Sequence, residues 1–306
     1  MRCIRHLLKN NNIHLRKKKG GKYIDGLIHC KNYSTSNASE GFVTTMNGYG
    51  VSLNSIDMFE EKFINEAEQL PRDSSILEIG SAFGKVTIEA LQRGSCNVCA
   101  NDIDKRHLDI VEQEWKERCS NNIYGDEEWQ RLQILHGDIC QILMSNSNNA
   151  LKIALPFPLR SILIANVLHF LSPSEIISIL TKFAEISKIN SIHGTETNLY
   201  ISLDSPWHQA YKLFWPVYNF KKHILKRTCP GFQKVRYPFK AFVPERLNAV
   251  KKYHVMEPDT LTILLNESGW NVVESKLFSG DEKNNPIGVS LGNNIEMVGA
   301  HAKIVH

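Results

Sequence analysis

The residues best suited to chemistry lie in one short stretch, where glycines and carboxylates recur at close spacing. Glu78 precedes Gly80 and Gly84, and Asp102 follows Gly84 by eighteen residues. Glycines let the backbone turn sharply and approach a ligand, while a carboxylate accepts hydrogen bonds from ribose hydroxyl groups. The spacing therefore predicts a site for a ligand that contains a nucleoside.

Two apolar strands must position these groups. Residues 76–79 form an apolar run that enters the glycine turn, and a short helix begins after Gly84. A second strand at 97–100 ends just before Asp102. If the two strands pair in parallel, Asp102 emerges beside the glycine turn, at the edge of the sheet where α/β proteins bind their ligands.

The form of the glycine turn separates two classes of cofactor. The dinucleotide fingerprint G-x-G-x-x-G is absent, and the turn reads L-E-I-G-S-A-F-G. In this form it resembles motif I of the class I S-adenosylmethionine-dependent methyltransferases. The resemblance implies that Glu78, Gly80 and Gly84 surround the methionine part of S-adenosylmethionine and that Asp102 holds its ribose. The alternative is a glycine turn in another kind of α/β protein.

Two further segments extend the resemblance. A third strand at 132–135 leads to Asp138, which the family places at the adenine amino group, although a Gly-Asp pair is also ordinary turn chemistry. The fourth strand, 161–165, leads into a segment similar to the N-V-L-H-x-L of many small-molecule methyltransferases. The cofactor site implied by the family comprises Glu78, Gly80, Ser81, Gly84, Asp102, Ile103, Asp138, Ile139 and Asn166.

His169, just past the fourth strand, is the candidate catalytic residue. An imidazole titrates near neutrality and can remove a proton from the methyl acceptor. An equal alternative is that His169 supports the cofactor loop. A carboxylate acceptor would need no base at all. The D/N-P-P-Y/F tetrad and the Pro-Cys nucleophile of nucleic-acid methyltransferases are absent from the chain. Cys96 and Cys99 form a lone C-x-x-C, which predicts buried thiols and no metal site.

The remaining periodicities complete an α/β fold. Helices are expected over 56–70, 105–119, 174–186 and from Pro258, and further strands over 198–203, 270–278 and 296–304. The order of elements resembles the methyltransferase sheet. It predicts a seven-stranded Rossmann-like sheet, mostly parallel with the last strand antiparallel, with helices on both faces and an inserted lid.

Two basic segments have been added to this acidic framework. Residues 1–32 carry nine Lys or Arg and one acid, and residues 205–253 carry eleven Lys or Arg, one acid and eleven aromatic residues. Residues 1–45 are therefore expected to be a basic, disordered extension and 46–306 the methyltransferase domain, with 205–255 inserted as a lid. Three interpretations of the insertion remain open: a cap over an acidic or aromatic substrate, a surface for nucleic acid or anionic membrane, and a structural flap.

The sequence thus predicts S-adenosylmethionine-dependent methyl transfer to a small acidic or aromatic acceptor. The alternatives are action on RNA or anionic membrane through segments 1–32 and 205–253, and a scaffold without catalysis. Seven scattered cysteines and the lack of an apolar run long enough to span a bilayer favour a cytoplasmic protein. A mitochondrial location is the alternative, because the amino terminus is basic and poor in acids.

Overall fold

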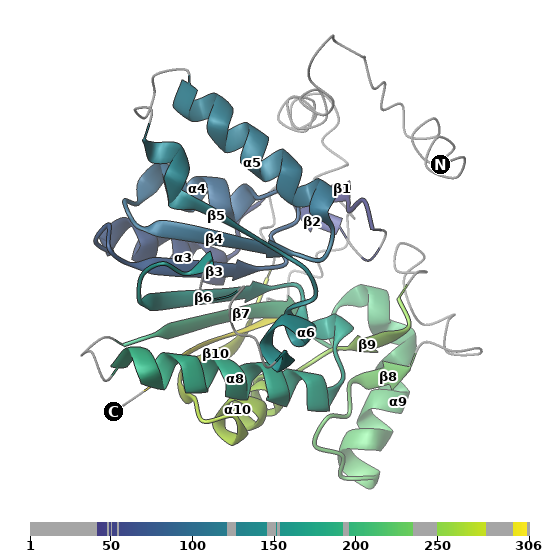
Figure 1. Ribbon diagram of the computed structural model, residues 1–306. Coiled ribbons are helices and arrows are strands. Elements are labelled where there is room, and N and C mark those ends of the chain that lie inside the picture. The colour runs from purple at the N-terminus through teal and green to yellow at the C-terminus, as the bar shows by residue number, and fades with distance from the viewer. Residues whose placement is uncertain are drawn as a thin grey trace, which may run out of the picture.

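The structure, a computed structural model, describes residues 42–47, 49, 51–53, 55–120, 127–145, 151, 154–191, 196–234, 250–279 and 296–304. Seven of its strands form one sheet in the order β10-β11-β7-β6-β3-β4-β5 (Figure 1). Strands β3 to β7 of this sheet pair in parallel, and β11 runs antiparallel between β7 and β10. The bounds are β3 Ser75–Ile79, β4 Asn97–Asp102, β5 Leu132–His136, β6 Leu159–Ala165, β7 Asn198–Asp204, β10 Asn271–Phe278 and β11 Met297–Lys303.

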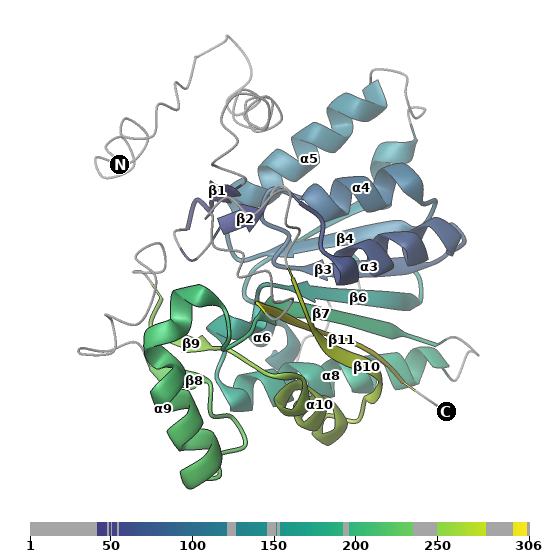
Figure 2. The same cartoon turned by 180° about the vertical axis from the view of Figure 1, so that it is seen from behind.

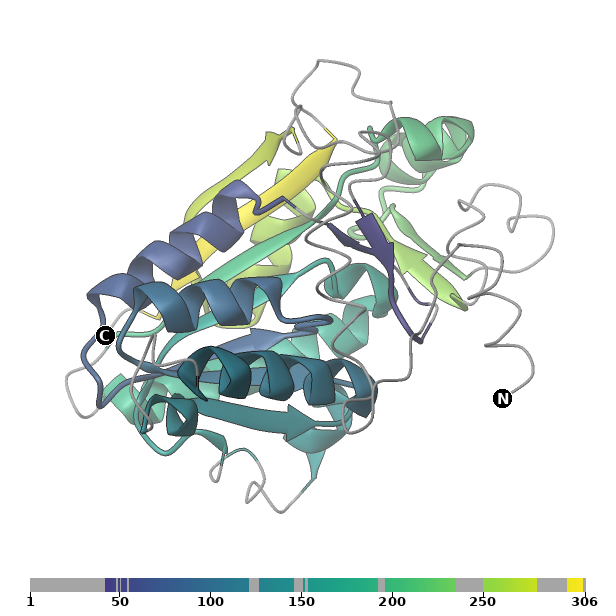
Figure 3. The same cartoon turned by 90° about the horizontal axis from the view of Figure 1, so that it is seen from above.

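The central strands are buried on both faces, as strands of a parallel sheet must be when helices cover both sides. In β3, Ile76 packs into one core, while Leu77 and Ile79 pack into the other. Because side chains alternate along a strand, Glu78 points to the same face as Ile76. This is the face covered by α3 Met58–Gln69, α4 Lys85–Arg93 and α5 Lys105–Ser120 (Figure 3).

The opposite face is covered by α8 Pro173–Ser191 and α10 Pro258–Glu267, with the short helix α6 Ile139–Met144 beside α8 (Figure 2). The apolar spacing predicted α3, α5, α8 and α10 to within a few residues of their ends, but α6 was not predicted, because a helix of six residues carries little periodic signal. Short 3₁₀ turns, η1 Glu128–Arg131 and η2 Leu168–Phe170, complete this part of the chain. The predicted seven-stranded fold is confirmed.

A small amino-terminal hairpin, β1 Phe42–Thr44 with β2 Val51–Leu53, lies at the carboxyl edge of the sheet (Figure 1). Phe42–Thr44 fall within residues 1–45, the range that the sequence assigned to the disordered extension. The backbone N–H of Met46 donates to His107 Nε2 of α5 at 2.9 Å, and the guanidinium of Arg106 donates to the Met46 carbonyl at 2.9 Å. These bonds hold the hairpin against the domain. The basic segment 1–32 lies outside the described residues.

The inserted segment folds into a small unit with a core of its own. It comprises η3 Gln209–Phe214, α9 Trp215–Asn219, the π-helical turn η4 Phe220–Ile224, and the hairpin of β8 Phe232–Lys234 with β9 Lys252–His254. None of these elements was predicted. Its aromatic residues mostly pack against one another, and the buried members of this core are Tyr211, Phe214, Tyr218, Val250, Tyr253 and Val255. The described part of the insertion is therefore a folded unit, and residues 235–249 lie outside the described chain.

Among the described residues, no helix is long and apolar enough to cross a membrane. Within the same ranges, no three His, Cys, Asp or Glu side chains are grouped as a metal site would require. Cys96 and Cys99 are buried free thiols, as the sequence predicted. Burial raises the pKa of Cys96 to about 11, so this thiol is chemically inert.

Candidate functional site

A cavity of about 460 Å³ opens at the carboxyl edge of the sheet, a size typical of small-molecule sites. Its wall combines the ends of β3 to β7 with the amino-terminal hairpin and part of the insertion. Parallel strands end at the same edge, so residues far apart in sequence meet here. The sequence-predicted residues that line it are Glu78, Gly80, Ser81, Asp102, Ile103, Asp138, Ile139, Asn166 and His169; Gly84 is not part of the wall.

The glycine turn after β3 depends on left-handed backbone angles. Gly80 has φ +72° and Gly84 has φ +73°, a region that favours glycine. A Cβ on Gly80 would lie 2.3 Å from the side chain of Val167, and one on Gly84 would lie 2.4 Å from that of Val111. This corrects the physical reason given to the glycines: close packing of the turn on the protein itself demands them, in addition to any approach of a ligand.

Two buried carboxyl groups lie beneath this turn. Burial raises the pKa of Glu78 to about 8, and the nearby Glu60 charge adds to the shift, while the hydroxyl of Thr87 donates to Glu78 and opposes it. Burial also raises the pKa of Glu60 to about 7, with Asp57 contributing. Lys85 Nζ lies 3.6 Å from Glu60 and is the cation nearest the pair among the described residues. A cation bound beside these two groups would favour their ionised forms.

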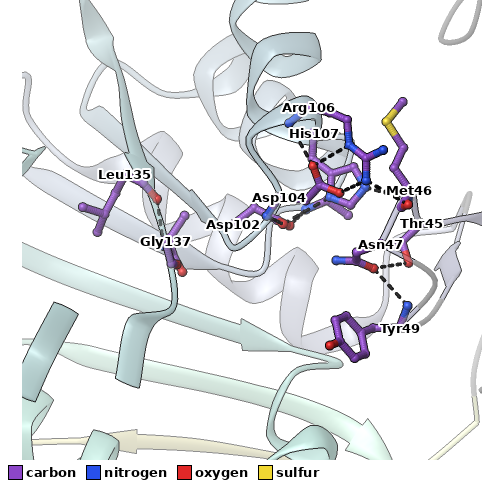
Figure 4. Close-up of polar contacts among 12 residues, drawn as sticks. Thr45, Met46, Asn47, Tyr49, Asp102, Asp104, Arg106, His107, Leu135 and Gly137 are labelled. Carbon is purple, nitrogen blue, oxygen red and sulfur yellow. Dashed lines mark hydrogen bonds and ion pairs between the residues drawn. The ribbon is translucent and has the colours of Figure 1, made fainter. Parts of the chain in front are cut away.

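Asp102 is held rigidly at the end of β4 (Figure 4). Its Oδ2 accepts from the Ala82 N–H at 2.9 Å, which fastens the carboxylate to the glycine turn, and its Oδ1 accepts from the Asp104 N–H at 2.8 Å. His107 Nδ1 lies 3.1 Å from Oδ1. Because His107 Nε2 accepts the Met46 N–H, the neutral ring carries its proton on Nδ1 and donates it to Asp102. The hairpin, the histidine and the carboxylate thus form one chain of hydrogen bonds.

The next strand supplies the other polar group of this wall. Asp138 begins α6 as its N-cap, and its Oδ1 accepts from the Cys140 N–H at 2.9 Å. Asn101 Nδ2 donates to the carbonyls of Leu135 and Gly137 at 2.8 and 3.0 Å, which ties the ends of β4 and β5 together. Beside this wall, the Ile103 side chain is 53% exposed at the mouth of the cavity. An apolar side chain so placed offers a surface to a flat ring.

His169 lies on η2, just after β6, and is buried. Its ring stacks on Tyr253 with centroids 4.9 Å apart and contacts the edge of Phe170 at 4.0 Å. Asn166, directly after β6, has φ +56°, so the chain turns sharply before reaching His169. The imidazole is thereby directed into the wall between the ends of β6 and β7.

Sequence reasoning missed the carboxylate at the end of β7. Both hydroxyls of Tyr211 and Tyr253 donate to Asp204 Oδ2, each at 2.6 Å. Burial opposes ionisation of Asp204, but positive charge on His208 and His169 and the two hydroxyl donors lower its pKa to about 2. Its position after a strand, as for Asp102 and Asp138, was a signal that could have identified it. Other lining residues missed from the sequence are Glu60, Lys85, His107 and Glu296.

Several cations of the insertion are engaged in structure. Lys221 Nζ donates to the Phe232 carbonyl at 2.9 Å and to Gln233 at 2.6 Å, and burial lowers its pKa. Lys222 pairs with Glu257, and Lys252 pairs with Glu175. These ion pairs offset two of the positive charges that the sequence assigned to the insertion.

No protein-family model and no curated protein sequence matches this chain. Solved structures similar to it include the glycopeptide N-methyltransferase MtfA complexed with sinefungin, at 12% identity over 82% of this chain and 88% of that chain, with a TM-score of 0.46. A S-adenosylmethionine-dependent methyltransferase from Clostridium acetobutylicum ATCC 824 is 10% identical over 82% and 93%, with a TM-score of 0.47. A SAM dependent methyltransferase from Aquifex aeolicus is 14% identical over 91% and 98%, with a TM-score of 0.44.

The strand order and directions described above define the class I S-adenosylmethionine-dependent methyltransferase fold, with the antiparallel β11 inserted beside β7. The glycine turn, Asp102 and Asp138 occupy the ends of the first three strands of this sheet.

Proposed function

We propose that the protein binds S-adenosylmethionine in this cavity and transfers its methyl group to a small acceptor. The observation that carries the proposal is one continuous cavity wall. It joins the residues suited to the cofactor, Glu78, Asp102 and Asp138, to a second group, His169 and Asp204, at the ends of the next two strands. A cofactor and an acceptor bound along this wall would lie side by side.

The donor set fits this cofactor. Ser81 Oγ is buried in the wall without a hydrogen-bond partner among the described residues, so it is available to a ligand carboxylate. Glu60 and Glu78 suit the ligand ammonium, because a nearby positive charge returns both groups to their ionised form. Asp102, fixed by the Ala82 N–H and by His107, suits the ribose hydroxyls.

S-adenosylmethionine supplies, when bound, an electrophilic methyl group on a sulfonium. Methyl transfer then requires little covalent help from the protein. The wall of β6 and β7 positions the acceptor, the hairpin around Met46 and Tyr49 helps to exclude water, and His169 accepts a proton where the acceptor carries one. The residues of this chain thus bind, orient and move one proton.

Titration calorimetry with S-adenosylhomocysteine tests cofactor binding directly. We expect saturable binding of S-adenosylhomocysteine and none of NAD. Asp102→Ala should weaken the affinity by roughly tenfold or more, since hydrogen bonds to a charged group contribute about 1.5–3 kcal/mol. Binding of NAD with no response to S-adenosylhomocysteine would instead indicate a dehydrogenase. Binding without methyl transfer to any compound of a cell extract would favour a non-catalytic scaffold.

A second candidate function is attachment of the insertion to an anionic lipid surface. The described residues 205–234 and 250–253 include no Asp or Glu. Ile224 and Leu225 are 67% and 48% exposed at the end of η4, which continues α9, and Lys226 and Arg227 follow them, also exposed. Figure 1 shows this helix at the periphery, and none of these tip residues lines the cavity. Exposed apolar side chains beside cations are typical of lipid-binding surfaces.

Flotation with phosphatidylserine and phosphatidylcholine vesicles tests this attachment. Binding only to the anionic vesicles, lost in Ile224→Asp, would support it. Binding to RNA, with steep salt dependence and no effect of Ile224→Asp, would favour a nucleic-acid surface instead.

A further inference from the structure

The acceptor side of the cavity is organised around Asp204. Its carboxylate is fixed through Oδ2 by the hydroxyls of Tyr211 and Tyr253, which are neutral donors and leave the negative charge in place. No Lys or Arg in the described part of the chain forms an ion pair with Asp204. A carboxylate kept ionised in a cavity wall, with only histidines to offset its charge, attracts a cationic ligand.

Aromatic rings surround the same region. Phe170 lies between Tyr49 and Tyr253, with ring centroids 6.2 Å from each, and all three residues line the cavity. Phe170 and Tyr253 are arranged edge-on, at 76°, and the Tyr253 ring is itself stacked on His169. Aromatic faces attract ammonium groups through their quadrupoles, and aromatic rings beside a carboxylate are a common way to bind amines.

The charges of the wall as a whole favour a cation too. Three lysines line the cavity, and two of them, Lys85 and Lys252, pair with Glu60 and Glu175, which leaves Lys251 at the exposed rim. Apart from Glu60 and Glu78, whose raised pKa values favour the neutral form in the free protein, the carboxyl groups of the wall still outnumber these lysines, and they are Asp102, Asp138, Glu175, Asp204 and Glu296. An anionic acceptor would be repelled by this wall.

We propose that the methyl acceptor is a small amine, bound as its ammonium form by Asp204, which the Tyr253 hydroxyl holds in place, and by the rings of Tyr49 and Phe170. This substrate class rests on the proposed methyl transfer, and it replaces the acidic acceptor that the basic composition of the insertion suggested. These four residues come from the hairpin, η2, β7 and β9, segments that only the fold brings together.

The charges balance through the reaction. The bound ammonium first gives one proton to solvent, or to His169 when that imidazole is neutral. The nitrogen lone pair then forms the new N–C bond as the C–S bond breaks, and the electron pair of that bond remains on sulfur. The product is a methylated ammonium with the same positive charge as the bound substrate. Asp204 therefore faces a cation both before and after the transfer.

Calorimetry with three probes of similar shape tests the recognition in the presence of saturating S-adenosylhomocysteine. The probes are benzylamine, benzyl alcohol and benzoate at pH 7. We expect benzylamine to bind at least tenfold more tightly than either of the others. Asp204→Asn should reduce benzylamine affinity at least tenfold and leave that of S-adenosylhomocysteine unchanged. Glu185→Gln, on the exposed surface of α8, is the matched control and should change neither.

Because Asp204 also anchors two tyrosines, Phe170→Leu serves as a second variant that leaves those hydrogen bonds intact. Phe170→Leu should lower the affinity for benzylamine several-fold and lower the affinity for benzyl alcohol by a smaller factor. A preference for benzoate, equal affinities, or no binding of benzylamine overturns the amine proposal while cofactor binding stands. Failure to bind S-adenosylhomocysteine refutes the proposed function itself, so the two failures are distinguishable.

The transferred label provides an independent readout. The protein is incubated with methyl-labelled S-adenosylmethionine and the low-molecular-weight fraction of a cell extract, and the products are separated by charge at pH 7. Label retained by a cation exchanger is expected. Label retained by an anion exchanger would overturn the proposal.

Discussion

The buried carboxyl pair beneath the glycine turn makes cofactor affinity depend on pH. The pKa of Glu78 is raised to about 8 and that of Glu60 to about 7, so in the free protein both groups are mostly protonated at pH 6. A ligand ammonium beside them favours the ionised forms, so binding releases protons. Affinity for S-adenosylhomocysteine should therefore rise as the pH increases from 6 to 8.

The size of the effect follows from the shifts. Each proton released changes the binding constant by up to about tenfold per pH unit, equivalent to about 1.4 kcal/mol. Glu78 ionises across the whole interval, so it alone should raise the affinity on the order of tens-fold between pH 6 and 8. Glu60 adds to this increase in the lower half of the interval, because its pKa is the lower of the two.

Calorimetry in phosphate and in Tris at pH 6, 7 and 8 measures both the affinity and the number of protons released. Glu78→Gln should reduce the dependence to the smaller part that Glu60 contributes and lower the affinity at pH 8. Methylthioadenosine lacks the amino-acid part of the cofactor and should bind with little change over the same range. An affinity of the native protein that is constant from pH 6 to 8, with equal heats in both buffers, would refute this reasoning.

Three further variants test the supports of the site. His254 is buried, and its burial lowers its pKa to about 3. Between pH 6.5 and 3 the unfolded chain therefore binds one more proton than the folded chain. As the pH falls through this range, urea denaturation should show the free energy of unfolding decreasing by up to about 1.4 kcal/mol per pH unit, and this contribution should be absent from His254→Phe. Gly80→Ala should lower the free energy of unfolding by about 1–3 kcal/mol, because Gly80 has a positive φ and a Cβ there would contact Val167. If the double variant with Val167→Ala is no more stable than Gly80→Ala alone, backbone strain accounts for the loss. His107→Ala should lower S-adenosylhomocysteine affinity several-fold at unchanged maximal binding by releasing Asp102, whereas an unchanged affinity would mean that the Ala82 N–H positions Asp102 by itself.

The sequence determined the framework because each of its signals is local. Periodicity of two and of 3.6 residues defines strands and helices, and a glycine turn directly after an apolar strand defines the first β-turn-α unit. From these follow the seven strands and the order of elements along the chain, and the resemblance to the methyltransferase sheet supplied their arrangement, which puts the ends of the parallel strands at one edge. The placement of Glu78, Asp102, Asp138 and His169 around one cavity is a consequence of that topology.

Only the tertiary structure decided which side chains surround these groups. Met46 reaches His107 across 61 residues, and Tyr253 reaches Asp204 across 49, and no spacing pattern reports contacts of that separation. The composition of the insertion suggested an aromatic, cationic lid. Folding instead buries many of its aromatic rings in a core and pairs Lys222 and Lys252 with glutamates of the main domain. Composition gives the number of charged residues. The electrostatic potential in a cavity depends on which of these charges are paired and where their side chains lie, and tertiary packing determines both.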